Sequence, residues 1–131
     1  MFSRSFKGVG LHYTAFRDAI REDSRQITPS RGVSPRKKFA VKANVESRVR
    51  LCDQLSRAVV SIPSNIAEGN GRSSRTDYAH FLAIARGSLY ETMTQLEIAK
   101  RQRYLADYAP AAELATSIRK MLNSMISKLT M

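Results

Sequence analysis

The apolar stripe between residues 75 and 104 is the feature that most constrains how this chain of 131 residues can fold. Apolar side chains recur there every three or four positions, which is the spacing of one face of an α-helix. The stripe consists of Tyr78, Phe81, Leu82, Ala85, Leu89, Thr92, Met93, Leu96 and Ala99. A second apolar line through Ile84, Tyr90 and Ile98 indicates that this helix is covered on more than one side. The stretch therefore predicts a long helix in a bundle, with further helices or other subunits supplying the cover.

A second helix is predicted over residues 45–67, again from apolar side chains at helical spacing. These side chains are Val45, Val49, Cys52, Leu55, Val59, Ile62 and Ile66. Pro63 lies within the stripe and removes one backbone donor, so we expect one helix with a kink there. Gly69 and Gly71 are predicted to end it by taking the left-handed conformation of a helix C-cap.

The remaining helix boundaries are predicted from capping residues. Ser74 and Asp77 have the spacing of a capping box, so the long helix is expected to begin there. Pro110 suits the first position of a last helix, whose apolar face extends to Leu129. No stretch alternates with a period of two for long enough to indicate a sheet. The predicted fold class is all-α, an up-and-down four-helix bundle.

The first 44 residues fit this pattern less well. Residues 11–27 have a weak helical pattern, and residues 28–38 hold two prolines, a glycine and four cations, which is typical of a linker. We therefore expect residues 1–44 to form a basic N-terminal segment and residues 45–131 to form the bundle core. Whether the segment is disordered or supplies the first bundle helix stays open at this point.

Charge indicates the class of partner. Lys and Arg number 22 against 11 Asp and Glu, a formal net charge of +11, which favours contact with a polyanion. The single cysteine, Cys52, cannot form an intramolecular disulfide and indicates a reducing compartment. No apolar run approaches the roughly 20 residues that span a bilayer. We expect a cytoplasmic protein with no membrane contact.

The candidate nucleic-acid contacts are cations that cluster away from the apolar stripes. They are Arg36, Lys37, Lys38, Arg72, Arg75, Lys100, Arg101 and Arg103. Neutralising phosphates with such residues gives an affinity that falls steeply with salt. The alternative is that these charges are only solvated, and composition does not decide between the two.

The string Ser61-Ile-Pro-Ser-Asn-Ile-Ala-Glu-Gly69 is the most distinctive in the sequence. One interpretation makes Asn65, Glu68 and Arg72 a small polar site near a helix end. The other, which we favour, makes Pro63, Asn65, Glu68 and Gly69 a structural motif in which polar side chains bond backbone groups freed by the proline and the helix end.

Polar side chains on the long helix predict pairing across helices or subunits rather than catalysis. These are Arg86, Glu91, Gln95 and Glu97, beside Gly87 and Ser88, which would let a neighbouring helix approach closely. No nucleophile with an adjacent base and no metal-ligand spacing occurs. We therefore predict no catalytic residue, no metal, no cofactor and no enzymatic activity.

Several strings match one family in order. Gln54-Leu-x-Arg-Ala58, the Ser61–Gly69 string, Gly71-Arg72, Phe81-Leu-x-Ile-Ala-x-Gly-Ser-Leu-x-Glu91 and Gln95-Leu96 are followed by Arg119-Lys-Met-Leu-Asn123. With them, residues 49–129 closely resemble the four-helix-bundle proteins encoded in bacterial 23S rRNA intervening sequences. The resemblance implies a bundle that assembles into a homopentamer and has no established enzymatic activity. A related branch, the accessory proteins of diversity-generating retroelements, implies nucleic acid and a reverse transcriptase as partners.

The N-terminal third departs from this family. Members open with an aromatic stretch, often containing Trp, that leads into a first long helix, whereas this chain has no Trp and is linker-like over residues 28–44. Charge and resemblance together predict a noncatalytic oligomeric bundle that binds RNA or DNA through basic surface residues. The alternative is a protein-interaction scaffold with no nucleic-acid role.

Overall fold

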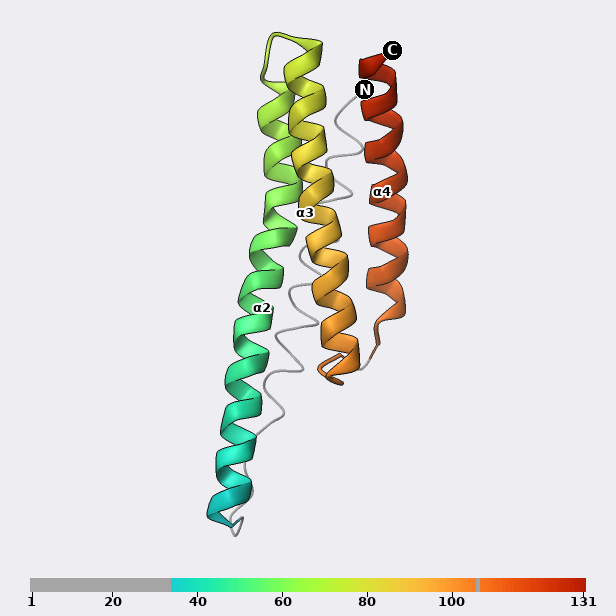
Figure 1. The fold of residues 1–131 in the computed structure, drawn as a ribbon. Coiled ribbons are helices and arrows are strands. Elements are labelled where there is room, and N and C mark those ends of the chain that lie inside the picture. The colour runs from blue at the N-terminus through green and yellow to red at the C-terminus, as the bar shows by residue number, and fades with distance from the viewer. Residues whose placement is uncertain (1–33, 106) are drawn as a thin grey trace.

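Three α-helices make up the computed structural model, which describes residues 34–105 and 107–131. They are α2 (Pro35–Asn70), α3 (Arg75–Arg101) and α4 (Ala109–Thr130). Consecutive helices run antiparallel, and α3 lies between the other two (Figure 1). The all-α prediction is confirmed, since the described residues contain no strand. The predicted four-helix bundle is wrong, because these residues supply three helices, and the weak helix expected over residues 11–27 lies outside them.

Helix α2 begins ten residues earlier than the sequence pattern predicted. Residues 35–44, which we expected to be a linker, are helical. Pro35 is tolerated at the first position because a helix leaves that N–H without a partner, and Ser34 precedes it in an extended conformation. The cations that follow are good helix formers, so their charge was a poor reason to expect a linker. The division of the chain at residue 44 stays a prediction.

Helix α2 passes through Pro63 as a single unbroken helix that bends gently (Figure 1). Two side chains that follow the proline bond carbonyls of the turn that precedes it. Ser64 Oγ donates to the Val60 carbonyl at 2.9 Å, and Asn65 Nδ2 donates to the Ser61 carbonyl at 2.8 Å. The prediction of one helix rather than two is therefore confirmed.

The two glycines near the end of α2 act differently from our expectation. Gly69 lies inside the helix, and Gly71, the C-cap residue, has a right-handed φ of −78°. The left-handed cap is therefore wrong. Gly69 is needed for space, because a Cβ there would lie 2.6 Å from Phe81 Cβ and 2.8 Å from Tyr78 Cδ2. At this position α2 and α3 approach too closely for any side chain.

The predicted capping of α3 is confirmed. The helix begins at Arg75, and the Asp77 backbone N–H donates to Ser74 Oγ at 2.9 Å. It ends at Arg101, three residues before the predicted end. Pro110 lies in the first turn of α4, as its missing N–H favours.

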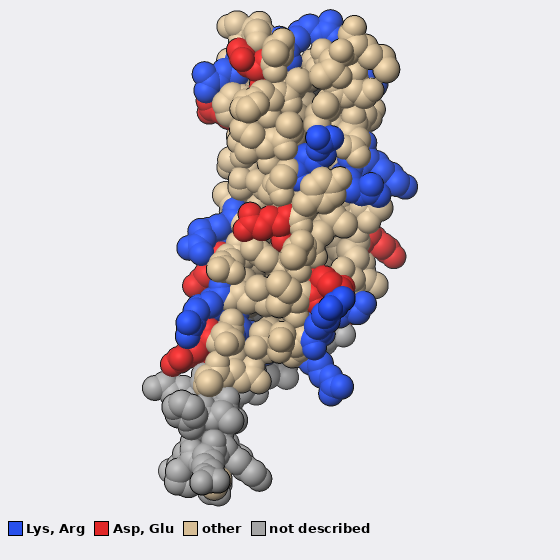
Figure 2. All heavy atoms as spheres, viewed as in Figure 1, with Lys and Arg blue, Asp and Glu red and all other residues tan. Residues whose placement is uncertain are grey.

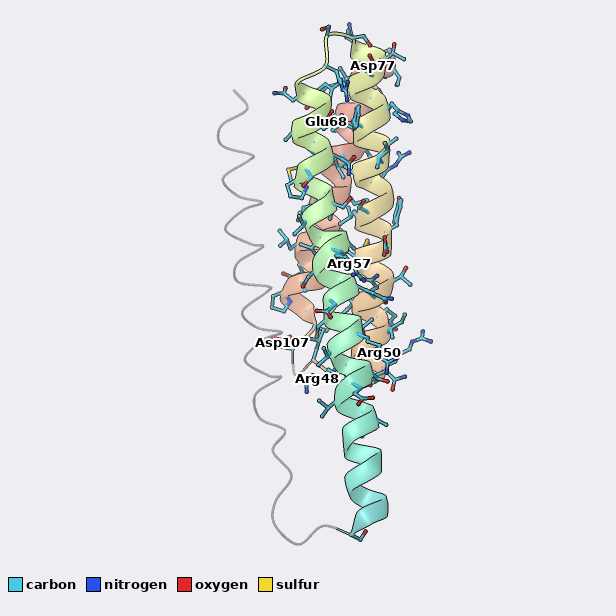
Figure 3. The ribbon with its side chains drawn as sticks, turned by 90° about the vertical axis from the view of Figure 1, so that its left-hand side faces the viewer. Arg48, Arg50, Arg57, Glu68, Asp77 and Asp107 are labelled. Carbon is cyan, nitrogen blue, oxygen red and sulfur yellow. The ribbon has the colours of Figure 1, made fainter. Side chains whose placement is uncertain are left out.

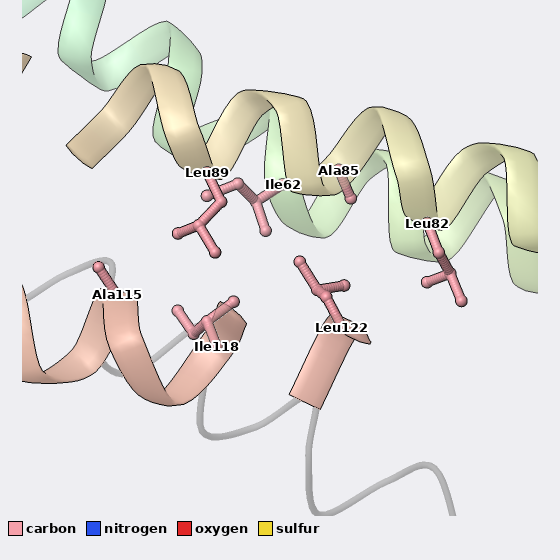
Figure 4. Close-up of a cluster of buried hydrophobic side chains, with 7 residues drawn as sticks. All are labelled: Ile62, Leu82, Ala85, Leu89, Ala115, Ile118 and Leu122. Atoms are coloured by element: carbon pink, nitrogen blue, oxygen red, sulfur yellow. The ribbon is translucent and has the colours of Figure 1, made fainter. Parts of the chain in front are cut away.

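The core lies along α3 and joins all three helices (Figure 4). Its buried members are Ile62 from α2, Leu82, Ala85 and Leu89 from α3, and Ala115, Ile118 and Leu122 from α4. A second cluster forms around Leu55 and Leu96. Most of the predicted main stripe of α3 is thus buried, and its other members, Tyr78, Phe81 and Met93, are half-buried. In contrast, Ile84, Tyr90 and Ile98 of the second line are 40%, 47% and 43% exposed.

Replacing Gly69 with alanine should destabilise the fold. The added methyl group overlaps Phe81 Cβ, which is attached to the backbone, and the ring of Tyr78, so α2 and α3 must move apart. Overpacking of this kind costs about 1–3 kcal/mol of unfolding free energy. Urea denaturation followed by circular dichroism measures the change.

Gly71→Ala is the matched control. A Cβ at residue 71 makes only ordinary contacts of 3.5 Å or more, and its φ suits any residue. We expect a change within about 0.5 kcal/mol. Equal stability of the two variants would contradict the close approach at Gly69.

Candidate nucleic-acid interface

The structure divides the predicted cations between the two ends of α3. Arg72 and Arg75 lie at the connection from α2 to α3, whereas Lys100 and Arg101 occupy the last turn of α3 and Arg103 follows it. A helix of 27 residues separates the two groups by roughly 40 Å. The predicted contacts therefore do not form one patch.

Arg36, Lys37 and Lys38 lie in the first turn of α2. This end of α2 extends beyond the end of α3 that carries Lys100 (Figure 1). Their side chains are outside the described part of the structure, so their role stays a prediction.

We call the group at the α2–α3 connection the loop end; it consists of Arg72, Arg75 and Lys128. Arg75 Nη2 donates to the Lys128 carbonyl at 2.7 Å, which ties the start of α3 to the end of α4. Arg72 pairs with Glu68 and lies 5.0 Å from the Phe81 ring centroid. Sequence reasoning missed Lys128 because 53 residues separate it from Arg75.

The second group, the turn end, consists of Arg48, Lys100, Arg101 and Arg103. Arg48 Nη2 donates to the Tyr104 carbonyl at 3.1 Å, and Lys100 Nζ lies 4.8 Å from the Tyr108 ring centroid. Arg48 is only 7% exposed and therefore supports the turn from inside, whereas Lys100 stays exposed. Arg48 was missed because it lies in α2, far from the cluster in sequence.

Arg103 has a left-handed backbone with a φ of 57°, the only positive φ among non-glycine residues in the described part of the chain. The Arg103 N–H donates to the Lys100 carbonyl at 3.0 Å, and the Tyr104 N–H donates to the Ala99 carbonyl at 2.9 Å. This is the Schellman pattern, in which glycine is the usual residue at the left-handed position. An arginine there carries conformational strain.

In the part of the chain that the structure describes, three exposed ion pairs join residues four apart in one helix: Glu46–Arg50, Glu68–Arg72 and Glu97–Arg101. The hydrogen bond from Arg101 is the main cause that lowers the pKa of Glu97, and the charge of Lys100 adds to it. In contrast, Arg75, Lys100, Arg103 and Lys128 form no ion pair with any described residue. Figure 2 shows cations spread over one face among acidic residues rather than in a continuous band.

Polar pairing on α3 differs in part from the prediction of contacts between helices. Arg86 Nη1 does cross to Asn123 Oδ1 of α4 at 3.1 Å, whereas Gln95 Nε2 donates to Glu91 Oε1 within α3 at 2.9 Å. Between α2 and α3, Ser61 Oγ and Ser88 Oγ are 2.8 Å apart.

The Pro63 motif bonds the backbone at a different place from the one expected. Pro63 leaves the Val59 carbonyl without an N–H donor, but Asn65 bonds Ser61, and the Glu68 side chain pairs with Arg72. Ser64, Ala67, Glu68, Gly71 and Arg72 line an open hollow of about 490 Å³ there.

A polar groove lies between α2 and α3 near the middle of the molecule. Its lining residues are Gln54, Arg57, Ala58, Ser61, Glu91 and Gln95, and its volume is about 340 Å³. Figure 3 shows Arg57 on the face where α2 and α3 lie side by side. None of these residues was predicted as a binding residue. They come from two helices, and no local pattern in the sequence shows that the fold brings them together.

The described ranges offer neither a metal site nor a membrane-spanning helix. No three His, Cys, Asp or Glu side chains of residues 34–105 and 107–131 lie close enough together to hold a metal ion. None of the three described helices has the length and apolar content to cross a membrane.

Comparison with known proteins gives one match. The sequence profile of a family described as "23S rRNA-intervening sequence protein" matches residues 37–124, about two-thirds of the chain. Neither the curated proteins nor the solved structures include a significant match.

Arg103→Gly should stabilise the protein. Glycine adopts the left-handed conformation without a Cβ penalty, so we expect a gain of about 1 kcal/mol in unfolding free energy. Arg101→Gly removes the same charge from a right-handed helical position and should cost about 1 kcal/mol. Chemical denaturation measures both, and a loss of stability in Arg103→Gly would contradict the strain at this position.

Proposed function

Because the chain belongs to the 23S rRNA-intervening sequence protein family, we propose that it is a noncatalytic, oligomeric helical protein that binds RNA through basic surface residues. The observation that carries the proposal is the presence of Arg75, Lys100, Arg103 and Lys128 at the two ends without an acidic partner among residues 34–105 and 107–131. Unpaired surface cations are available to phosphates at no cost in broken ion pairs. The rRNA in the family's name favours RNA over DNA as the nucleic acid.

Rigidity of the cationic ends supports this proposal. At the loop end, the bond from Arg75 Nη2 to the Lys128 carbonyl holds the Arg75 guanidinium against the end of α4. At the turn end, the Schellman turn fixes the backbone of Arg103, and the Tyr108 ring lies against the Lys100 ammonium. Side chains that are already placed lose less conformational entropy when they bind.

Self-assembly is the second part of the proposal. Ile84, Tyr90 and Ile98 remain more than a third exposed on α3, and Gly87 has open space around its Cα. Apolar side chains grouped on one helix are typical of a surface that contacts another protein. The family resemblance suggests five subunits, and the cytoplasm, where rRNA is found, is the compartment that we propose.

RNA binding should depend strongly on salt and on the turn end. We expect the double variant Lys100→Gln, Arg103→Gln to reduce the slope of log K against log[salt] by about 1 for each cation removed. The double variant Arg119→Gln, Lys120→Gln removes the same charge from the middle of α4 and should change the slope less. Fluorescence anisotropy with a labelled 23S rRNA fragment at two salt concentrations measures both.

No binding at low salt, to this RNA or to duplex DNA, would overturn the RNA proposal. Capture of a protein partner that survives nuclease treatment, together with absent RNA binding, would favour an interaction scaffold instead.

Self-assembly should depend on the exposed apolar line of α3. Light scattering should give a mass that is a multiple of 14.7 kDa, and Ile84→Lys should lower it because a charge then enters an apolar contact. Ser117→Lys, at an exposed position in α4, is the control. A monomer mass for the unchanged protein at micromolar concentration would contradict this part of the proposal.

A further inference from the structure

We propose that the polar groove between α2 and α3 binds a single unpaired guanine base of the RNA, an inference that rests on the proposed RNA-binding function. The groove is built from Gln54, Arg57, Ala58 and Ser61 of α2 and from Glu91 and Gln95 of α3. Its volume of about 340 Å³ is at the lower end of the range for ligand pockets, which suits one base.

Two hydrogen-bond acceptors of the groove, Glu91 and Gln95, lie one turn apart on α3. Gln95 is only 7% exposed, and its Nε2 donates to Glu91 Oε1. A carboxylate only accepts hydrogen bonds, so this contact fixes the amide with its nitrogen toward Glu91. Gln95 Oε1 is then buried with no partner among the described residues. A buried acceptor in this state is costly and therefore uncommon.

A ligand with two adjacent donors would relieve this arrangement. The Glu91 carboxylate has lone pairs beyond the one that binds Gln95 Nε2, so it can accept one ligand donor and keep that bond. A small rotation of the Gln95 side chain would then bring Oε1 to the adjacent donor of the same ligand. Binding would satisfy an acceptor that the unbound protein leaves unpaired.

Arg57, a hydrogen-bond donor, further restricts the kind of ligand that fits the groove. Arg57 lines the same groove as Glu91, but the two form no ion pair with each other or with another described residue. A ligand that satisfies both must offer donors to Glu91 and an acceptor to Arg57. A simple cation would be repelled by Arg57, and a simple anion by Glu91.

Ser61, which lines one side of the groove, already has hydrogen-bond partners within the protein. Ser61 Oγ contacts Ser88 Oγ at 2.8 Å and accepts from Asn65 Nδ2 at 3.0 Å. These bonds hold α2 and α3 at a fixed separation beside the groove. The polar groups left to bind a ligand are therefore those of Gln54, Arg57, Glu91 and Gln95, of which the last three lie at the charged and buried part of the site.

Guanine is the nucleobase that meets these requirements. It presents N1–H and the N2 amino group as adjacent donors, together with O6 and N7, the acceptors that arginine commonly binds. Adenine and cytosine lack the paired donors, and uracil would turn carbonyl oxygens toward Glu91. Bases that are not paired in RNA are commonly read along these edges.

The experiment compares three labelled heptamers, UUUGUUU, UUUAUUU and UUUIUUU, by fluorescence anisotropy with the full chain. Inosine lacks the 2-amino group of guanine and tests the paired donors directly. We expect the guanine heptamer to bind on the order of tenfold more tightly than the other two. Glu91→Gln and Arg57→Gln should each abolish this preference.

Glu97→Gln is the matched control, because it makes the same charge change on the same helix, where Glu97 pairs with Arg101 outside the groove. It should keep the preference for guanine. Thermal melts establish that each variant is folded, and light scattering reports its mass.

Three outcomes would overturn the inference. Equal binding of all heptamers would refute the guanine site while leaving salt-dependent RNA binding intact. Absence of binding to any RNA at low salt would remove the proposed function as well. A changed mass in Glu91→Gln would assign the groove to contact between copies of the chain.

Discussion

Burial of the leucine stripe of α3 between two antiparallel helices is the interaction on which the rest of the structure depends. Leu82 and Leu89 are at most 1% exposed, and they lie in one cluster with side chains of both α2 and α4. Helices of this length owe most of their stability in proteins to such packing rather than to intrinsic propensity. Loss of one buried leucine side chain typically costs 2–5 kcal/mol, a large share of the roughly 5–15 kcal/mol that stabilises a domain. The other two helices are therefore positioned by α3.

The central position of α3 also decides where charge can act. Its length places the loop end and the turn end roughly 40 Å apart, so a polyanion that touches both must be extended. Three of the arginines are paired with glutamates one turn before them, an arrangement that contributes little to stability at exposed positions. The described surface cations therefore fall into two sets: arginines that are partly neutralised by a glutamate, and cations that form no ion pair with a described residue. Arg103 and Lys128 belong to the unpaired set, one at each end.

The close approach of α2 and α3 creates both a structural requirement and a candidate site. Near the end of α2 the helices meet at Gly69, where no side chain fits. Further along, Ser61 and Ser88 bridge the helices, and the groove with Arg57 and Glu91 opens beyond them. The apolar packing of α2 against α3 thus sets the positions of the polar side chains along the edge of this interface. Gln95, buried but incompletely bonded, lies at the border between the two.

The sequence by itself determined the helical class, the buried stripe of α3, its Ser74 cap and the continuity of α2 through Pro63. These features depend on local spacing and capping, which act between residues a few positions apart. Tertiary structure alone decided that Gly69 serves close packing, that Lys128 joins Arg75, and that Arg57 and Glu91 share a groove. It also decided that the candidate cations separate into two ends, because their positions depend on how antiparallel helices align. Such contacts join residues tens of positions apart, and no local pattern in the chain records them.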